Sequence, residues 1–207
     1  MAARRSRKTA KKVTTAPRKS GGGQTTLVVV LLVLVVVLGY LGYAGLFSPV
    51  TVSEQETGPF SRMLPAQQGS YRQTPATIEA VRAAARSVGV EPEAACGIFL
   101  DNPREVKTAD LRAQVGLVIA AKDREKIRRL PAAITYKHLE KAKCLVAEFP
   151  FRAGLSVWLG VMRVYPALNQ AAAARNLERV PALEIYRDHA TITYLMPIVP
   201  KESPAAK

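Results

Sequence analysis

Residues 26–47 (TLVVVLLVLVVVLGYLGYAGLF) form an unbroken apolar run without a charged residue. As an α-helix, this run would extend roughly 33 Å, enough to cross the ~30 Å hydrocarbon core of a bilayer. A helix in the core of a soluble domain keeps a polar face, and the apolar stretch of a signal peptide is shorter, about 7–15 residues. The pattern therefore predicts one uncleaved transmembrane helix.

From residue 48 onward, short strand-like stretches alternate with stretches of helical period. Helices are predicted at 74–89, where Pro75 follows an N-cap Thr74, and at 153–178, where Pro166 is expected to kink or split the helix because it lacks a backbone N–H. Residues 61–74 and 122–133 are predicted to be a loop and a connector. The predicted strands lie at 49–60, 94–103, 111–120, 143–151, 181–189 and 190–198, the last two joined by a tight turn near Asp188-His189.

The order strand–helix–strand–strand occurs twice along residues 48–200. Short echoes accompany it: TGPF recurs as EFPF, and IFLDN as EIYRD. Duplicated units of this kind pack as one antiparallel sheet with helices on one face and a groove along the pseudo-dyad. The predicted fold class is therefore α+β, preceded by a single transmembrane helix.

The formal net charge of +14 is concentrated at the N-terminus, where residues 1–25 hold eight Lys and Arg and no acid. Only acids, Glu54 and Glu56, follow the apolar run closely, so the positive-inside rule places the N-terminus in the cytoplasm and the domain outside. We expect a disordered basic tail (1–25), the transmembrane helix (26–47), the domain (48–200) and a short tail (201–207).

The basic tail has two interpretations, a nucleic-acid-binding arm or a topology signal that contacts anionic lipid. It has no interleaved aromatic residues and it abuts the apolar run, so membrane lipid is the expected partner and nucleic acid is not.

Motifs for metal or cofactor binding are absent from the sequence. Cys96 and Cys144 lack CxxC spacing, and His138 and His189 are isolated, so neither a metal site nor a cofactor is predicted. A disulfide between the two cysteines is allowed outside the cell, and the spacing leaves that pairing open. No nucleophile–base pair and no phosphate loop is visible, so no catalytic residue is assigned and an enzyme is the less favoured interpretation.

Four motifs in order resemble the GyrI-like superfamily, which includes the effector-binding domains of multidrug-responsive regulators. They are GIFLDNP (97–103), EFPFRAG (148–154), LSVWLGVMRVYPAL (155–168) and PALEIY (181–186). The middle two are especially similar to a membrane-anchored branch that includes an animal receptor for autophagy of the endoplasmic reticulum. The chain ends in PKESPAAK rather than in that receptor's long acidic tail, and no DNA-reading segment precedes the domain, so neither role is carried over.

The resemblance implies a pseudo-two-fold fold with a cleft for a small, apolar or cationic molecule. It also implies a ligand carboxylate on a late strand, a role that falls on Glu184 with aromatic support from Tyr186. From strand alternation alone, Glu184 lies either in the groove or on an open, solvated face of the sheet. Strand alternation places Leu183 and Ile185 on the opposite face, where we expect them to pack beneath the helices. Trp158, Tyr165 and Tyr194 are the further candidate ligand-binding residues, each with core packing as its alternative.

Three functions remain open at this point. The first is a membrane-anchored domain that binds a lipophilic or cationic small molecule. The second is a membrane-tethered protein-interaction module whose groove has become filled. The third is a hydrolase of small reactive electrophiles in which Glu184 assists water, because some superfamily members are reported to act on strained rings.

Overall fold

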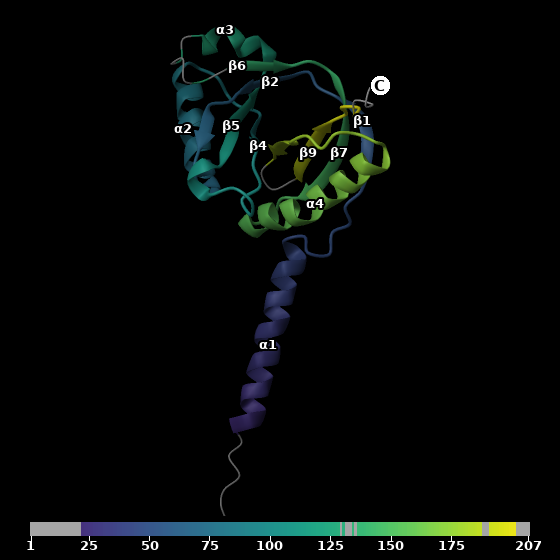
Figure 1. The fold of residues 1–207 in the computed structure, drawn as a ribbon. Helices are drawn as coiled ribbons and strands as arrows, with labels where there is room; N and C mark the ends of the chain where they lie inside the picture. The colour runs from purple at the N-terminus through teal and green to yellow at the C-terminus, as the bar shows by residue number, and fades with distance from the viewer. Residues whose placement is uncertain (1–21, 129, 131–133, 135, 188–190, 202–207) are drawn as a thin grey trace, which may run out of the picture. The chain divides into compact units, whose positions relative to one another are not determined.

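The computed structural model describes residues 22–128, 130, 134, 136–187 and 191–201. Most of the predicted basic tail, the turn at Asp188-His189 and residues 202–207 lie outside this part of the chain. Two compact units are distinguished, Met1–Gly39 and Tyr40–Lys207. The ribbon of both is drawn in Figure 1.

Helix α1 (Gly22–Tyr43) contains the apolar run. Within the described residues it is the one helix long and apolar enough to cross a membrane, and that statement rests on length and composition, which a signal sequence can share. Its leucine and valine side chains from Leu27 to Leu38 are exposed to the surroundings. The structure thus agrees with a membrane-spanning helix, whereas its orientation is not defined.

The second unit is built on one antiparallel sheet, with the strand order β1-β7-β9-β8-β4-β5-β2-β6 and with β3 paired to β5. The strands are β1 (Val52–Thr57), β2 (Phe60–Met63), β3 (Ala66–Gln68), β4 (Ala94–Phe99), β5 (Arg112–Ile119), β6 (Tyr136–Leu139), β7 (Ala142–Pro150), β8 (Leu183–Tyr186) and β9 (Thr191–Pro197). Two helices accompany it, α2 (Thr74–Ser87) and α4 (Gly154–Ala174), together with the short α3 (Arg124–Ile127).

The strand order has a pseudo-two-fold axis between β4 and β8. Exchanging β1 with β6, β2 with β7, β4 with β8 and β5 with β9 reverses the order of the sheet and leaves it otherwise unchanged. The predicted duplication is visible in this order, with one difference: β1 and β6 are extra outer strands that cross to the other repeat, because β1 pairs with β7 and β6 pairs with β2.

Both long helices cover the same face of the sheet. Leu117 of β5 packs with Val81 of α2, and Ile192 of β9 packs with Leu168 of α4. Ala95 of β4 joins the two clusters, and it is the cross-strand partner of both Leu117 and Tyr186. This arrangement confirms the α+β prediction with helices on one face.

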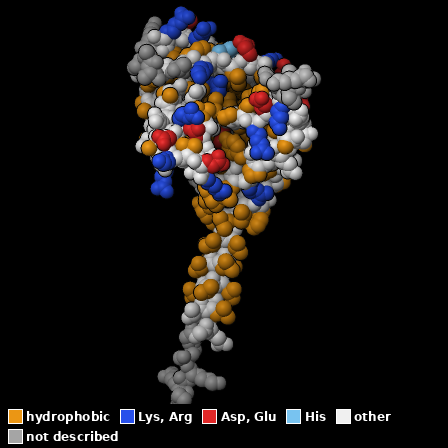
Figure 2. All heavy atoms as spheres, in the orientation of Figure 1, with side chains coloured by type: hydrophobic (Ala, Val, Ile, Leu, Met, Phe, Trp, Pro, Cys, Tyr) orange, Lys and Arg blue, Asp and Glu red, His pale blue; other side chains and the backbone are white. Residues whose placement is uncertain are grey.

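The opposite face of the sheet is concave and carries its own apolar core. Leu64, directly after β2, and Cys144 of β7 belong to one buried cluster although β2 and β7 lie near opposite ends of the strand order, so the sheet must curl. Figure 1 shows the curled sheet with α2 and α4 beside it, and in the same view Figure 2 shows hydrophobic side chains in a hollow of the molecule with charged side chains around it.

Several local predictions were wrong. Part of the predicted loop at 61–74 is strand, because β2 pairs with both β5 and β6, and the polar Ser61 and Arg62 are buried there together with Met63. Helix α4 is not split at Pro166, because it continues from Gly154 to Ala174: the ring lies on the exposed face, and core residues Val164 and Leu168 hold the helix on both sides.

Leu183 and Ile185 do not lie beneath the helices either. They belong to the concave core, and Glu184 and Tyr186 face α4 instead. The reversal follows from the curl of the sheet, since the concave face needs apolar side chains as much as the helix-covered face does.

Candidate functional site

Glu184 lies at the centre of the sheet, on β8 next to the pseudo-two-fold axis. Its neighbours across the strands are Gly97 of β4 and Tyr194 of β9. The side chain is 0% exposed, because α4 covers this face of the sheet. A carboxyl group is rarely buried to this extent without a partner.

Two tyrosines hold the Glu184 carboxylate, one to each oxygen. The hydroxyl of Tyr165, on α4, donates a hydrogen bond of 2.7 Å to Oε1. The hydroxyl of Tyr186, two positions along β8 and on the same face, donates a short hydrogen bond to Oε2. The carboxylate is therefore fixed from both the helix and the strand, as a buried acceptor must be if it is to retain a charge.

Burial governs the electrostatics of this cluster. Removal from water raises the pKa of Glu184 from 4.5 to about 7, while the hydrogen bonds from Tyr186 and Tyr165 act in the opposite direction. Burial and the nearby carboxylate both raise the pKa of Tyr165 well above its ordinary value, so its hydroxyl stays a donor. At neutral pH the group is poised between a carboxylic acid and a carboxylate.

Tyr194 completes the floor of the site. Its ring is fully buried and packs edge to face against Tyr165, with 5.8 Å between ring centroids. The Tyr194 hydroxyl is buried and lacks a hydrogen-bond partner within the described residues. It can approach α4 because residue 160 is glycine, and a Cβ at that position would overlap the hydroxyl oxygen.

Four of the five candidate residues are therefore brought together: Glu184, Tyr186, Tyr165 and Tyr194. Trp158 is not among them, since its side chain is 57% exposed on the outer face of α4. Sequence reasoning missed Gly160 and also Phe151, whose ring contacts Tyr186 edge to face with centroids 6.0 Å apart. The glycine inside an apolar helical run was the available signal for a close approach.

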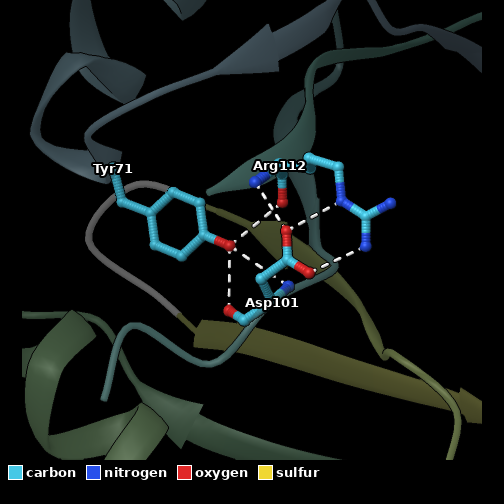
Figure 3. A network of polar contacts seen from close by, with 3 residues as sticks. All are labelled: Tyr71, Asp101 and Arg112. Carbon is cyan, nitrogen blue, oxygen red and sulfur yellow. Dashed lines mark hydrogen bonds and ion pairs between the residues drawn. The ribbon is translucent and has the colours of Figure 1, made fainter. Parts of the chain in front are cut away.

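A second polar cluster joins the turn after β4 to β5 (Figure 3). Asp101 accepts hydrogen bonds from the backbone N–H of Arg112 (2.7 Å) and from its guanidinium (2.8 and 3.0 Å). The Tyr71 hydroxyl lies 2.9 Å from the carbonyl oxygen of Asp101 and 3.0 Å from that of Arg112. The hydrogen bonds from Arg112 lower the pKa of Asp101. Asp101 and Arg112 already neutralise each other, so this cluster stabilises the turn after β4 and leaves no unpaired charge for a ligand.

The cysteines and the potential metal ligands supply no further site. Cys96 and Cys144 are both buried and free, which answers the question of their pairing in this structure. Burial raises the pKa of Cys96 to about 12, so its thiol is a poor nucleophile. Within the described part of the chain, no group of three or more His, Cys, Asp or Glu side chains is arranged for a metal ion.

Sequence comparison finds two curated mammalian proteins. The chain is 27% identical over 157 residues to mouse testis-expressed protein 264 homolog, covering 71% of this chain and 48% of that protein. It is 27% identical over 162 residues to human testis-expressed protein 264, covering 73% of this chain and 50% of that protein. The chain thus spans about half the length of the curated relatives that it matches. No family model matches the sequence.

Structure comparison supports the fold class. The C-terminal domain of EcmrR superposes with a TM-score of 0.55 at 9% identity, over 73% of this chain and 98% of that domain. EcmrR in a complex with DNA gives a TM-score of 0.54 at 10% identity, over 86% of this chain and 69% of that chain. At these identities the likeness concerns the fold alone.

These structural neighbours belong to the GyrI-like, effector-binding fold class, and the expected resemblance holds at that level. The comparisons establish no membrane-anchored branch. Because one neighbour is bound to DNA, they also lend no support to the exclusion of nucleic acid as a partner.

Proposed function

We propose that this chain is a single-pass membrane protein whose GyrI-like domain binds a small lipophilic cation at Glu184. The observation that carries the proposal is the chemistry around the carboxylate. Within the described residues, Glu184 is bonded to two tyrosine hydroxyls and pairs with no Lys or Arg. A carboxylate buried without a counter-cation is costly, and a bound cation would offset that cost.

The aromatic side chains around Glu184 suit the same class of ligand. Tyr165, Tyr186 and Tyr194 present rings as well as hydroxyls, and Phe151 stacks against Tyr186. Each aromatic face attracts a cation by about 0.5–2 kcal/mol, with the larger values where water is excluded. The site would therefore favour cations with apolar substituents over small hydrated ions such as sodium.

Access to the site requires movement of Tyr165. Glu184 and Tyr194 are fully buried and Tyr186 is 9% exposed, whereas Tyr165 is only partly buried. In our proposal the cation displaces the Tyr165 hydroxyl from Oε1 of Glu184 while Tyr186 keeps its hydrogen bond to Oε2. Rotation of one side chain at the edge of α4 then opens the path without disturbing the sheet.

Cation binding would be linked to deprotonation of Glu184. Because the pKa of Glu184 is raised to about 7, the free site carries a proton on a large fraction of molecules below neutral pH. Only the carboxylate attracts a cation, so affinity is expected to rise with pH up to about 7 and to level off above it.

A thermal-shift screen of lipophilic cations tests the site assignment. The full chain in lipid nanodiscs should gain stability with at least one cation, and the Glu184→Gln variant should gain none from the same compound. Trp158→Phe is the matched control, because it alters an aromatic residue outside the cluster and should respond as the wild type does. Equal shifts for wild type and Glu184→Gln across the panel would defeat the assignment.

The membrane orientation follows from the charge pattern. Eight cations precede α1 and acids follow it, so we propose that the N-terminus is cytoplasmic, in contact with anionic lipid, and that the domain is extracytoplasmic. Protease added to the outside of sealed spheroplasts or vesicles of known sidedness should digest the domain. Protection of the domain until the membrane is opened would reverse this assignment.

A second candidate function is a membrane-tethered protein-interaction module. It is favoured by a stripe on α4 formed by Trp158, Val161 and Met162, which are 57%, 40% and 44% exposed at helical spacing. A photo-crosslinking residue placed at position 162 should then capture a specific protein, whereas one at Ala83, exposed on α2, should not. Equal labelling at the two positions would remove this candidate.

A further inference from the structure

The concave face of the sheet contains a buried arginine that the cation site does not use. Arg62 lies on β2 and is 6% exposed. Its cross-strand neighbours are Val118 of β5 and Lys137 of β6. Val118 belongs to the concave apolar core, so Arg62 lies on that face, opposite to the face that holds Glu184.

The Arg62 side chain lacks a carboxylate partner within the described residues, and the one charge interaction that it makes there is with the Cys96 thiol. Its Nε is buried without a hydrogen bond, and none of its nitrogens forms an ion pair with a carboxylate of the described residues. Buried charges in proteins are paired or coordinated, since an unpaired one loses its hydration without compensation. Burial accordingly lowers the pKa of Arg62. A buried cation without a carboxylate partner is a favourable position for an anion.

A second cation lies directly beside the first. Lys137 is paired across the strands with Arg62, so the two side chains project from the same face. Like charges in this position repel each other. The Lys137 ammonium donates a 3.1 Å hydrogen bond to the neutral side chain of Gln114, which does not neutralise it. Two adjacent cations that pair with no carboxylate of the described residues form a favourable position for one anionic group.

The surface next to the two cations is apolar. Phe60 and Leu139 are the next cross-strand pair on β2 and β6 that faces the same way, and both are partly buried against the concave core. Ile98 of β4 is also partly buried there. The buried residues of this face, among them Leu64 and Val118, continue the apolar surface beyond Phe60 and Leu139. A cationic pair thus adjoins an apolar pair on the same two strands.

We propose that the concave face is a second binding site, in which Arg62 and Lys137 hold the carboxylate or phosphate of an amphiphilic anion and Phe60 and Leu139 contact its apolar part. Arginine can hold such a group through two parallel hydrogen bonds, whereas lysine adds a point charge. The site lies on the face of the sheet opposite Glu184 and selects the opposite charge. It stands independently of the cation site.

The test uses the full chain in nanodiscs of zwitterionic lipid, with octanoate and octyl phosphate as probes and octanol as a neutral probe of equal chain length. Thermal unfolding and calorimetry are measured for wild type, Arg62→Met and Lys137→Met. Arg104→Met is the control, because it removes an exposed cation outside the sheet. Parallel titrations with octanoate and octyl phosphate distinguish a carboxylate ligand from a phosphate one.

We expect one or both anions to raise the Tm of wild type and of Arg104→Met, and octanol to have no such effect. Arg62→Met should bind at least tenfold more weakly, and in the absence of anion its Tm should equal or exceed that of wild type, since an unpaired buried charge has been removed. Lys137→Met should bind several-fold more weakly with unchanged Tm. A purely structural Arg62 predicts the opposite, a lowered Tm and unchanged anion affinity.

The proposal is overturned if octanol stabilises the protein as strongly as the anions do, or if Arg62→Met binds the anions like wild type. Should Arg62→Met fail to fold, Arg62→Lys and Lys137→Met decide the matter, and full affinity in both variants contradicts the site. Glu184→Gln should leave anion binding unchanged. A failure of this proposal can therefore be told apart from a failure of the cation site.

Discussion

Tyr165 and Glu184 are 19 positions apart in the sequence, and their side chains are joined by a hydrogen bond of 2.7 Å. One residue is on α4 and the other on β8, so the bond ties the helix to the centre of the sheet. It also makes the least buried member of the cluster the one that covers the carboxylate. The Tyr165–Glu184 hydrogen bond therefore links the position of α4, the protonation of Glu184 and the access of a ligand to the carboxylate.

The pH dependence of stability should reveal Glu184. Its pKa is 4.5 when unfolded and about 7 when folded, so between these values the folded state binds more protons than the unfolded state. The stabilisation from this proton is present below pH 4.5 and is lost as pH rises to about 7, by roughly 3 kcal/mol. The stability of wild type relative to Glu184→Gln should fall by that order between pH 5 and 8. A constant difference would show that the carboxyl group titrates normally.

Removing the Tyr165 hydroxyl should raise the pKa of Glu184 further. The hydrogen bond from Tyr165 favours the charged carboxylate, so its loss in Tyr165→Phe leaves burial less opposed. Carbon-13 NMR of labelled glutamate side chains would follow the titration. Tyr136→Phe is the control, because the Tyr136 hydroxyl bonds Ser61 in another part of the sheet. A lowered pKa in Tyr165→Phe would mean that the bond acts mainly on the protonated form.

The contact between Gly160 and Tyr194 predicts a non-additive pair of variants. Gly160→Ala forces a methyl group onto the Tyr194 hydroxyl and should lower stability by about 1–3 kcal/mol. Tyr194→Phe removes a buried hydroxyl that lacks a partner and should be neutral or stabilising. The double variant should recover part of the loss, as measured by chemical denaturation. If the stability changes of the two single variants simply add up in the double variant, residue 160 and the Tyr194 hydroxyl are not in contact.

The exposed position of Trp158 predicts its fluorescence. It is the only tryptophan in the chain, and 57% of its side chain is accessible. Iodide should quench its emission in the folded protein, and a cation bound at Glu184 should leave the quenching nearly unchanged. If a lipophilic cation strongly protects Trp158 from iodide quenching, Trp158 does belong to the ligand-binding site.

Much of this architecture could be predicted because it depends on short-range patterns. The α1 helix, the hairpin of β8 and β9 and the repeated order of elements all follow from the period of the apolar residues. Glu184, Tyr186, Tyr165 and Tyr194 were selected through strand parity and motif resemblance, and they do lie together.

The remaining features depend on long-range contacts that no local pattern contains. The crossing of β1 and β6 between the repeats pairs residues more than seventy positions apart, as Ser61 and Tyr136 show. Residue spacing alone could not show that Arg62 is buried, because an arginine in a strand is ordinarily exposed. The side of the sheet that α4 covers depends on the curl of the whole sheet, and for this reason the positions of Leu183 and Glu184 were assigned to the wrong faces.

The most direct test of the central claim is isothermal titration calorimetry with two ions of the same size and opposite charge. Tetraphenylarsonium and tetraphenylborate are titrated at pH 7.5 into the full chain in nanodiscs and into Glu184→Gln, and the heat of partition into empty nanodiscs is subtracted. Tetraphenylarsonium should bind wild type saturably, and it should bind Glu184→Gln at least tenfold more weakly. Equal binding of the cation to both proteins would contradict it.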